Sequence, residues 1–156
     1  HPRAILSGVS AIRQGCPIVT DTNMARAGIR QRDLARFGGT VNCYMTDERV
    51  AETAARKGIT RAKAAVDVAA PLLSGGIYVV GNAPTALLRL IERIDQGTVH
   101  PALVVGLPVG FVNAAESKAL LLECDVPYIT NVGRKGGSNV AAAVVNALII
   151  KAGEDR

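Results

Sequence analysis

Hydrophobic residues along the chain follow two patterns: short continuous apolar runs, and longer stretches with apolar residues at helical spacing. A short apolar run bounded by turn residues is typical of a strand buried on both faces of a parallel sheet. Five such runs predict five strands, at residues 17–20, 41–45, 77–81, 103–107 and 128–132.

The stretches between these runs predict helices. One of them places apolar residues at i, i+3, i+4 and i+7, namely Leu87, Leu90, Ile91 and Ile94. Asp47 and Thr60 are residue types that cap helix N-termini, and Gly58 suits the end of a helix that starts after Asp47. Strands alternating with helices imply βαβ crossovers. We therefore expect residues 1–156 to form one α/β domain, a doubly wound, mainly parallel sheet of about five strands with helices on both faces.

Composition and charge limit the partners of this domain. Hydrophobic residues make up 49% of the 156-residue chain, yet no apolar run approaches the roughly 20 residues of a membrane-spanning helix. The net charge of +5 favours anionic partners. Aromatic residues make up 3%, with no Trp, and no Lys/Arg cluster is denser than Arg134-Lys135. Because stacking platforms for bases need aromatic rings, we do not expect nucleic acid as a partner. The lack of a long apolar run means that we do not expect a membrane either.

The cysteines and histidines point to no metal site. Cys16, Cys43 and Cys124 are widely spaced and form no CxxC pair, which favours reduced thiols in a cytoplasmic protein. The two histidines, His1 and His100, stand at no familiar metal-ligand spacing from the cysteines. His100 precedes a proline, which indicates a surface turn.

Polar and glycine-rich loops follow four of the predicted strands. Because the carboxyl ends of parallel strands meet at one edge of a sheet, these loops are expected to form one rim, where open parallel sheets bind ligands. Helices that open from such loops present free N–H groups, which favour anions. The loops comprise residues 20–24, 81–85, 106–113 and 133–139.

The familiar motifs of nucleotide-binding and hydrolytic enzymes are absent from these loops. The dinucleotide pattern GxGxxG, the phosphate-binding pattern GxxxxGK[ST] and the nucleophile elbow GxSxG do not occur. The hypothesis of a phosphate- or nucleotide-binding enzyme is therefore supported by the glycine-rich loops alone. The residues by themselves indicate an anion-friendly rim without naming a reaction.

The same loops carry a resemblance to a known family, precorrin-8X methylmutase. The match extends from about residue 3 to residue 149, in order and at natural spacing, and includes Gly58–Arg61. The long string GLPVGFVNAAESK is highly specific. The matching segments are CPIVTDTNM at 16–24, GNAPTAL at 81–87, GLPVGFVNAAESK at 106–118 and GRKGGS at 133–138.

The resemblance implies an isomerase of cobalamin biosynthesis, an intramolecular transferase that needs no cofactor. Members of the family move a methyl group from C11 to C12 of a tetrapyrrole in a formal 1,5-sigmatropic shift. Precorrin-8X then gives hydrogenobyrinic acid, and cobalt-precorrin-8 gives cobyrinic acid. The family also implies a homodimer that binds the macrocycle in a large pocket at the subunit interface.

The substrate's acetate and propionate arms are carboxylates, which agrees with the basic charge and the helix N-termini of the rim. By resemblance, Arg61 is the best candidate to bind an arm or lie beside the ring, and Arg134 is a second. We expect no metal ligand. The expected substrate-binding residues are Asp21, Thr22, Asn23, Arg61, Asn82, Thr85, Ser117, Lys118, Arg134 and Ser138.

One departure concerns the catalytic residue of the family, a histidine thought to protonate a ring nitrogen during the migration. It lies in a segment before the helix with which this chain begins, so it has no match here. Three explanations stay open, of which we favour the first: the chain lacks its amino-terminal segment, it binds corrinoids without catalysis, or His1 serves instead. The second makes a non-catalytic tetrapyrrole-binding protein the alternative function.

Overall fold

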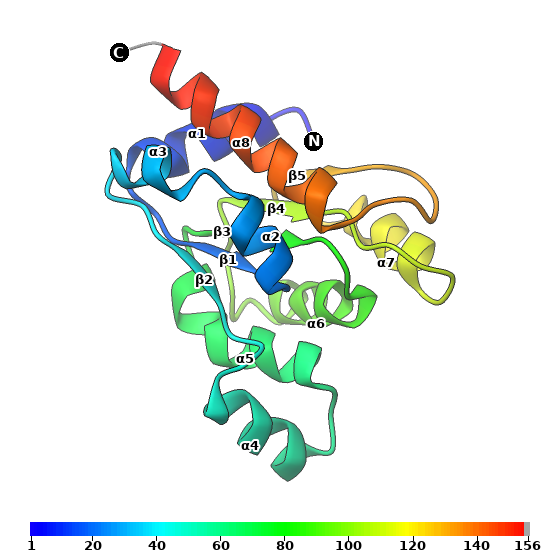
Figure 1. Cartoon of the computed structure of the whole chain (residues 1–156). Helices are drawn as coiled ribbons and strands as arrows, with labels where there is room; N and C mark the ends of the chain where they lie inside the picture. The colour runs from blue at the N-terminus through cyan, green and yellow to red at the C-terminus, as the bar shows by residue number, and fades with distance from the viewer. Residues whose placement is uncertain (155–156) are drawn as a thin grey trace.

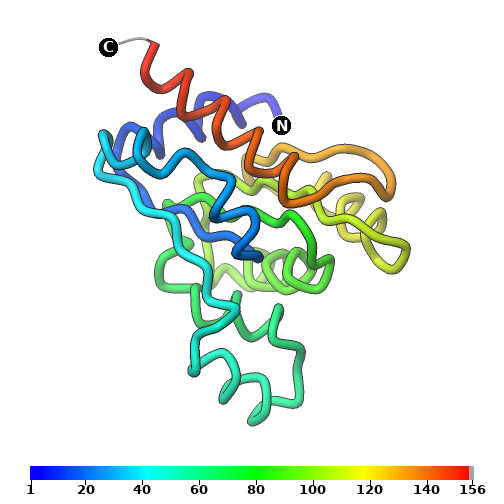
Figure 2. Tube along the Cα trace, in the orientation of Figure 1, coloured from blue at the N-terminus to red at the C-terminus, as the bar shows by residue number. Residues whose placement is uncertain are grey.

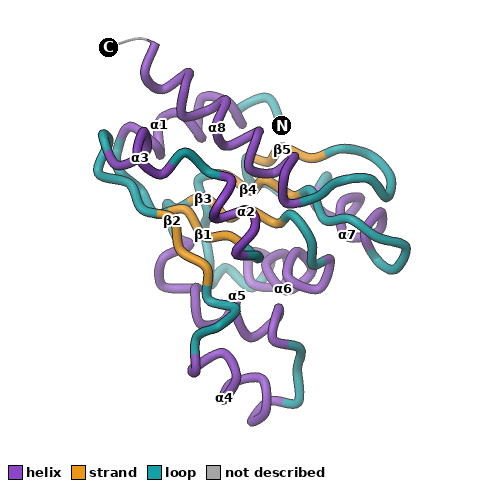
Figure 3. The backbone as a smooth tube through the Cα atoms, viewed as in Figure 1, coloured by secondary structure: helices purple, strands orange, loops and turns teal. Residues whose placement is uncertain are grey.

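A computed structural model describes residues 1–154, in which five strands form one sheet between two layers of helices (Figure 1). All strand pairs are parallel, and their spatial order is β2-β1-β3-β4-β5. The expected α/β fold class is thereby confirmed. The strands, orange in Figure 3, are β1 (Ile18–Thr20), β2 (Val41–Cys43), β3 (Ile77–Val80), β4 (Leu103–Gly106) and β5 (Tyr128–Thr130).

Each face of the sheet has its own hydrophobic core, because side chains alternate along a strand. Ile77 and Val79 of β3 belong to one core, and Tyr78 and Val80 to the other. The inner strands β1, β3 and β4 are buried throughout, as expected. The edge strands β2 and β5 are mostly half-buried, because each has a neighbouring strand on one side alone.

The helices divide between the two faces, as Figure 2 shows in the path of the chain. The first core contains residues of α1 (Ala4–Arg13), α3 (Gln31–Ala35) and α8 (Ser138–Glu154), with α2 (Asn23–Gly28) packed on α8. The second contains residues of α5 (Arg61–Leu73), α6 (Pro84–Asp95) and α7 (Ala114–Leu121). Beyond them, α4 (Glu48–Lys57) packs on α5.

The predicted helix ends are confirmed by their caps. The Asp47 carboxylate accepts a hydrogen bond from the Arg49 N–H at the start of α4, and Gly58 ends this helix at φ 62°. The Thr60 hydroxyl accepts from the Lys63 N–H at the start of α5. The helices α2 and α3 were not predicted, because six and five residues are too few to show a helical period.

A buried carboxylate joins α4, α5 and α6. Asp67, whose side chain is 6% exposed, accepts hydrogen bonds of 2.7–3.0 Å from Lys57, Arg89 and Arg93. Arg89 also binds Glu92 at 2.8 Å, and we call these five residues the Asp67 cluster. Burial alone raises the pKa of Asp67, but the hydrogen bonds from Arg89, Lys57 and Arg93 outweigh it and hold the pKa well below its ordinary value. The cluster thus fixes the α4–α5 hairpin to the body of the molecule.

Two expectations from composition concern the cysteines and membranes. Cys16, Cys43 and Cys124 are free thiols as expected, although each is half-buried rather than fully within the core. Within residues 1–154, no helix has the length and apolar character needed to cross a membrane.

Candidate functional site

The loops after β1, β3, β4 and β5 meet at the carboxyl ends of the strands. We call the surface formed by residues 20–23, 81–85, 107–113 and 131–138 the carboxyl rim. Backbone hydrogen bonds join the last two loops, from Gly137 N–H to the Leu107 carbonyl (3.0 Å) and from Gly110 N–H to the Arg134 carbonyl (3.2 Å). Both loops extend past α7 at the right of Figure 1. The predicted clustering of these loops is therefore seen in the fold.

Asp21 lies at the switch point of the sheet, between β1 and β3, where the strand order reverses. Its buried carboxylate accepts hydrogen bonds from the backbone N–H groups of Gly81 (2.8 Å), Asn82 (2.9 Å) and Ala83 (2.8 Å). Burial raises the pKa of Asp21, and the same N–H groups oppose that rise. The loop that leads into α6 therefore already holds an anion, the protein's own carboxylate, at a place where the sequence led us to expect a ligand.

Thr22 and Ser138 connect the first and last loops of the carboxyl rim. Their hydroxyl oxygens lie 2.7 Å apart, and the Thr22 hydroxyl also accepts a hydrogen bond from the Ala25 N–H at the start of α2. Gly81 packs against this junction so closely that a Cβ there would lie 2.5 Å from the Ser138 Cα. Thr22 and Ser138 thus hold α2, α8 and the β3–α6 loop together.

Ser117 and Lys118 are both buried on α7. The Ser117 hydroxyl donates to the Ala114 carbonyl within the helix at 3.1 Å. The Lys118 ammonium donates to the Asn131 side chain and to the Lys135 carbonyl, both in the β5–α8 loop. Both side chains are therefore engaged inside the protein.

The other expected site residues face solvent to different degrees. Asn23, Asn82 and Arg134 are exposed on the carboxyl rim, while Thr85 is half-buried at the start of α6. Arg61 is the exposed first residue of α5, which runs antiparallel to the strands and so begins on the side of the rim. The fold thus brings nine of the ten residues onto adjoining loops and helix starts, with Arg61 on a separate helix. Their contacts with a substrate remain predictions.

Exposed apolar side chains on the carboxyl rim were missed by the sequence analysis. Phe111 is 86% exposed and Val132 is 90% exposed. Val109 and Val112, which lie close to Phe111 in the sequence, are exposed as well. The Arg134 guanidinium lies 6.0 Å from the centre of the Phe111 ring, in a cation–π arrangement. The sequence signal that could have revealed these exposed side chains is the presence of apolar residues inside a loop rich in Gly and Pro. Such a patch with cations beside it suits a large apolar ligand that carries acidic groups.

The turn that presents this patch contains strained backbone. Asn113 caps α7 at φ 62° and is the one non-glycine residue with positive φ in the described chain. Asparagine tolerates this conformation better than most residues. Gly136 lets the β5–α8 loop approach closely, because a Cβ there would clash with the Leu107 carbonyl oxygen. The shape of the rim thus depends on these particular residue types.

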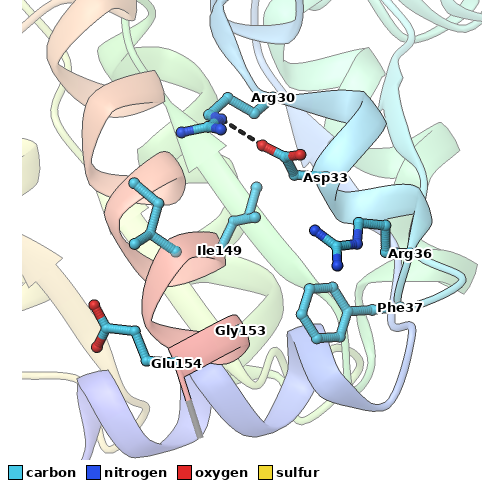
Figure 4. Close-up of a pocket in the computed structure, with 8 residues that line it drawn as sticks. Arg30, Asp33, Arg36, Phe37, Ile149, Gly153 and Glu154 are labelled. Atoms are coloured by element: carbon cyan, nitrogen blue, oxygen red, sulfur yellow. Dashed lines mark ion pairs between the residues drawn. The ribbon is translucent and has the colours of Figure 1, made fainter. Parts of the chain in front are cut away.

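Two hollows of the structure lie away from the rim. Figure 4 shows one of about 410 Å³ between α3 and the end of α8, where Arg30 pairs with Asp33 and Phe37 faces Ile149. Because α8 begins at the rim and runs back along the sheet, this hollow lies at the amino ends of the strands. A neighbouring hollow of about 690 Å³ is lined by a basic cluster that the sequence analysis missed, Arg30, Arg32 and Arg36.

The two histidines lie in different places: His100 is away from the carboxyl rim, whereas His1 lines a hollow of about 410 Å³ that includes Asn131 and Val132 of the rim. The His100 carbonyl accepts from Gly75 N–H at 2.9 Å, which places this exposed residue before β4, at the amino ends of the strands. The His1 ring lies edge-on to Tyr128, the first residue of β5, at 5.5 Å. Within the described residues, no three His, Cys, Asp or Glu side chains gather in a way that could hold a metal ion.

Comparisons with known proteins all lead to one family. A family model described as precorrin-8X methylmutase matches residues 1–151. The chain is 48% identical over 152 residues to cobalt-precorrin-8 methylmutase of Priestia megaterium, covering 97% of this chain and 68% of that protein. It is 54% identical over 140 residues to the protein of the same name from Salmonella typhimurium, covering 89% and 65%.

A solved structure, precorrin-8x methyl mutase from Thermus thermophilus, superimposes with a TM-score of 0.90 at 45% identity. The alignment covers 97% of this chain and 73% of that one. The likeness therefore extends through the whole fold described above, including every loop of the carboxyl rim.

Proposed function

The chain belongs to the precorrin-8X methylmutase family, and we propose that it acts as an isomerase of corrin-ring synthesis on precorrin-8X or cobalt-precorrin-8. The family match over residues 1–151 carries this proposal. That match includes the four loops of the carboxyl rim, where the fold gathers the side chains available to a ligand.

The proposed reaction moves one methyl group within the substrate. The bond from C11 to the methyl carbon breaks, a bond from C12 to it forms, and the double bonds of the ring shift to match. Substrate and product are isomers, so the balance needs no oxidant, reductant or second substrate. Protonation of a ring nitrogen makes the macrocycle an electron sink for the migration.

Features of the carboxyl rim support a substrate of this chemistry. The exposed side chains of Phe111, Val112 and Val132 offer an apolar surface to a macrocycle. Arg134 beside Phe111 offers a guanidinium that can bind a carboxylate arm with two hydrogen bonds. Arg61 is a second candidate for an arm, and the exposed amides Asn23 and Asn82 offer neutral hydrogen bonds.

We propose that the protein works as a homodimer in the cytoplasm. The carboxyl rim is an open surface, and a macrocycle with several arms needs walls that a second subunit can supply. Three free cysteines agree with a reducing compartment. Sedimentation at several concentrations tests the dimer, and a monomer throughout contradicts it.

Visible spectroscopy of the purified protein mixed with precorrin-8X or its cobalt form tests the function directly. Because the rearrangement changes the conjugation of the ring, conversion gives a new absorption spectrum. Arg134→Gln is expected to weaken substrate binding, and Arg32→Gln, at the far end of the molecule, serves as the matched control. If neither substrate binds, the proposal is wrong.

The alternative is a tetrapyrrole-binding protein without catalysis. It is favoured by the scarcity of histidines at the site, since His100 lies at the amino ends of the strands and His1 alone borders the carboxyl rim. In the same experiment it predicts a shifted spectrum on binding that then stays constant. If conversion does occur, His1→Ala distinguishes a catalytic role for His1, which predicts loss of conversion, from a role elsewhere.

A further inference from the structure

Lys118 is a buried ammonium group beneath the β5–α8 loop. Lys118 belongs to α7 and is 1% exposed. Its Nζ donates hydrogen bonds to the Lys135 carbonyl at 2.7 Å and to Asn131 Oδ1 at 3.1 Å. The Asn131 Nδ2 donates to the same Lys135 carbonyl at 2.9 Å. The three groups close the loop at its base, and we call them the Lys118 clamp.

Among the described residues, no carboxylate forms an ion pair with this ammonium group. In the described part of the chain, both partners of Lys118 are neutral oxygens, and burial lowers its pKa. A buried charge without a counter-ion is costly, so an apolar residue of similar size would pack here at less expense in free energy. An apolar residue cannot donate a hydrogen bond to the Lys135 carbonyl. We therefore infer that the hydrogen bonds are what the lysine contributes at this position.

The loop closed by this clamp carries Arg134. The Arg134 carbonyl accepts from Gly110 N–H, and its guanidinium lies over the Phe111 ring. Residue 134 adjoins residue 135, whose carbonyl Lys118 holds. A shift of this carbonyl therefore displaces Arg134 from the β4–α7 loop and from the ring.

We propose that Lys118 is a positioning residue, which closes the β5–α8 loop so that Arg134 is held over Phe111 to receive a carboxylate of the substrate. Lys118 itself does not contact the substrate, because its head is turned into the loop and its residue is buried. The identity of the carboxylate ligand rests on the proposed function, whereas the closing of the loop does not.

Amide hydrogen exchange measured residue by residue tests the clamp without any substrate. The reporters are the Gly110 N–H, bonded to the Arg134 carbonyl, and the Gly137 N–H, bonded to the Leu107 carbonyl. Lys118→Met keeps the apolar stem and removes the donor, and it is expected to speed exchange at both amides roughly ten- to a hundredfold. Lys151→Met, which removes an exposed lysine of α8, is the matched control and leaves both rates unchanged. Unchanged exchange in folded Lys118→Met overturns the proposal.

Asn131→Ala keeps the proposal testable if Lys118→Met does not fold. Asn131 is exposed, so its truncation leaves the core intact, yet it removes one acceptor of Lys118 and one donor to the Lys135 carbonyl. The expected result is a several-fold acceleration at Gly110 and Gly137. Rates equal to those of the unmodified protein contradict the clamp.

Titration with precorrin-8X, followed in the visible spectrum, tests what the closed loop does. Folded Lys118→Met is expected to bind about tenfold more weakly, with the rate of any conversion at saturation within about twofold of the unmodified protein. A lower rate at saturation with unchanged affinity overturns the positioning role. If the unmodified protein does not bind precorrin-8X, the proposed function fails, while the exchange experiment still decides whether the clamp exists.

Discussion

The Asp67 cluster and the Lys118 clamp are two ways of burying a charge in the same protein. Asp67 of α5 is surrounded by three cations from the two neighbouring helices, α4 and α6, so its charge is more than neutralised. Within residues 1–154, both hydrogen-bond partners of Lys118 are neutral oxygens. The first arrangement fixes helices to one another. The second fixes a loop and leaves a positive charge close to the surface where the proposed substrate binds.

Asp21 is a third case, a buried negative charge that contacts no cation among the described residues. Its partners are three backbone N–H groups of the loop that follows β3. Unpaired buried charges of both signs therefore lie under the carboxyl rim, whereas the paired one lies at the far helices. The comparison indicates that charge is neutralised where it supports the fold and left unneutralised where it shapes the site.

Asp67→Asn is expected to give the largest loss of stability in this comparison. The amide leaves three cations partly unpaired, so the free energy of unfolding falls by about 3 kcal/mol. Urea unfolding measures this change. Glu92→Gln, which removes a half-exposed member of the cluster, is the control and costs less than about 1 kcal/mol. Equal losses in the two variants contradict the central role of Asp67.

Asp21→Asn is expected to lower the free energy of unfolding by about 2 kcal/mol. An amide NH₂ group replaces one oxygen that now accepts from a backbone N–H, so a buried donor loses its partner. Asp47→Asn is the control, because asparagine caps a helix about as well as aspartate. Thermal or urea unfolding compares the two, and a loss no larger than that of Asp47→Asn contradicts the role given to Asp21.

Acid titration distinguishes Asp67 from Asp21, because their pKa values are shifted in opposite directions in the folded protein. The pKa of Asp67 is lower in the folded protein than its ordinary value of 3.8, so its stabilisation is full above that value and is lost as pH falls below it. The pKa of Asp21 is raised, so its ionisation costs stability as pH rises above 3.8. The stability difference between the unmodified protein and Asp67→Asn should shrink by about 1 to 2 kcal/mol from about pH 5 to about pH 2. A difference that stays constant with pH contradicts the pairing.

Arg134→Gln is expected to have the smallest effect on stability, within about 0.5 kcal/mol, because its guanidinium is exposed. Its effect on binding is expected to be larger, about a tenfold loss of affinity for precorrin-8X at low salt. The loss should narrow as ionic strength rises, since salt screens an exposed charge. If the affinity for precorrin-8X does not change in this variant, Arg134 is not part of the binding site.

Much of the fold could be predicted from the sequence, because the signals are local. Runs such as residues 77–81 predict buried strands by themselves, and Asp47, Gly58 and Thr60 mark helix ends with side chains that act within a few residues. The short helices α2 and α3 were not predicted, since their helical state depends on packing against α8 and the first core.

The candidate site could be predicted only in part. The position of the loops after the strands indicated where they meet, but not which side chains turn inward. Phe111 was overlooked because an aromatic residue in a loop has no period to reveal its exposure. The arginines around α3 were overlooked because they are spaced along the sequence and come together in a short helix.

The sequence by itself determined the fold class, the family and the four loops of the carboxyl rim, because these follow from local patterns and from a long matching string of residues. The tertiary structure alone decided what each polar side chain does. Asp21 and Lys118 find their partners about 60 and 15 residues away in the chain, at distances set by the packing of strands and helices. A side chain's partner is a property of three-dimensional proximity, which a one-dimensional pattern does not contain.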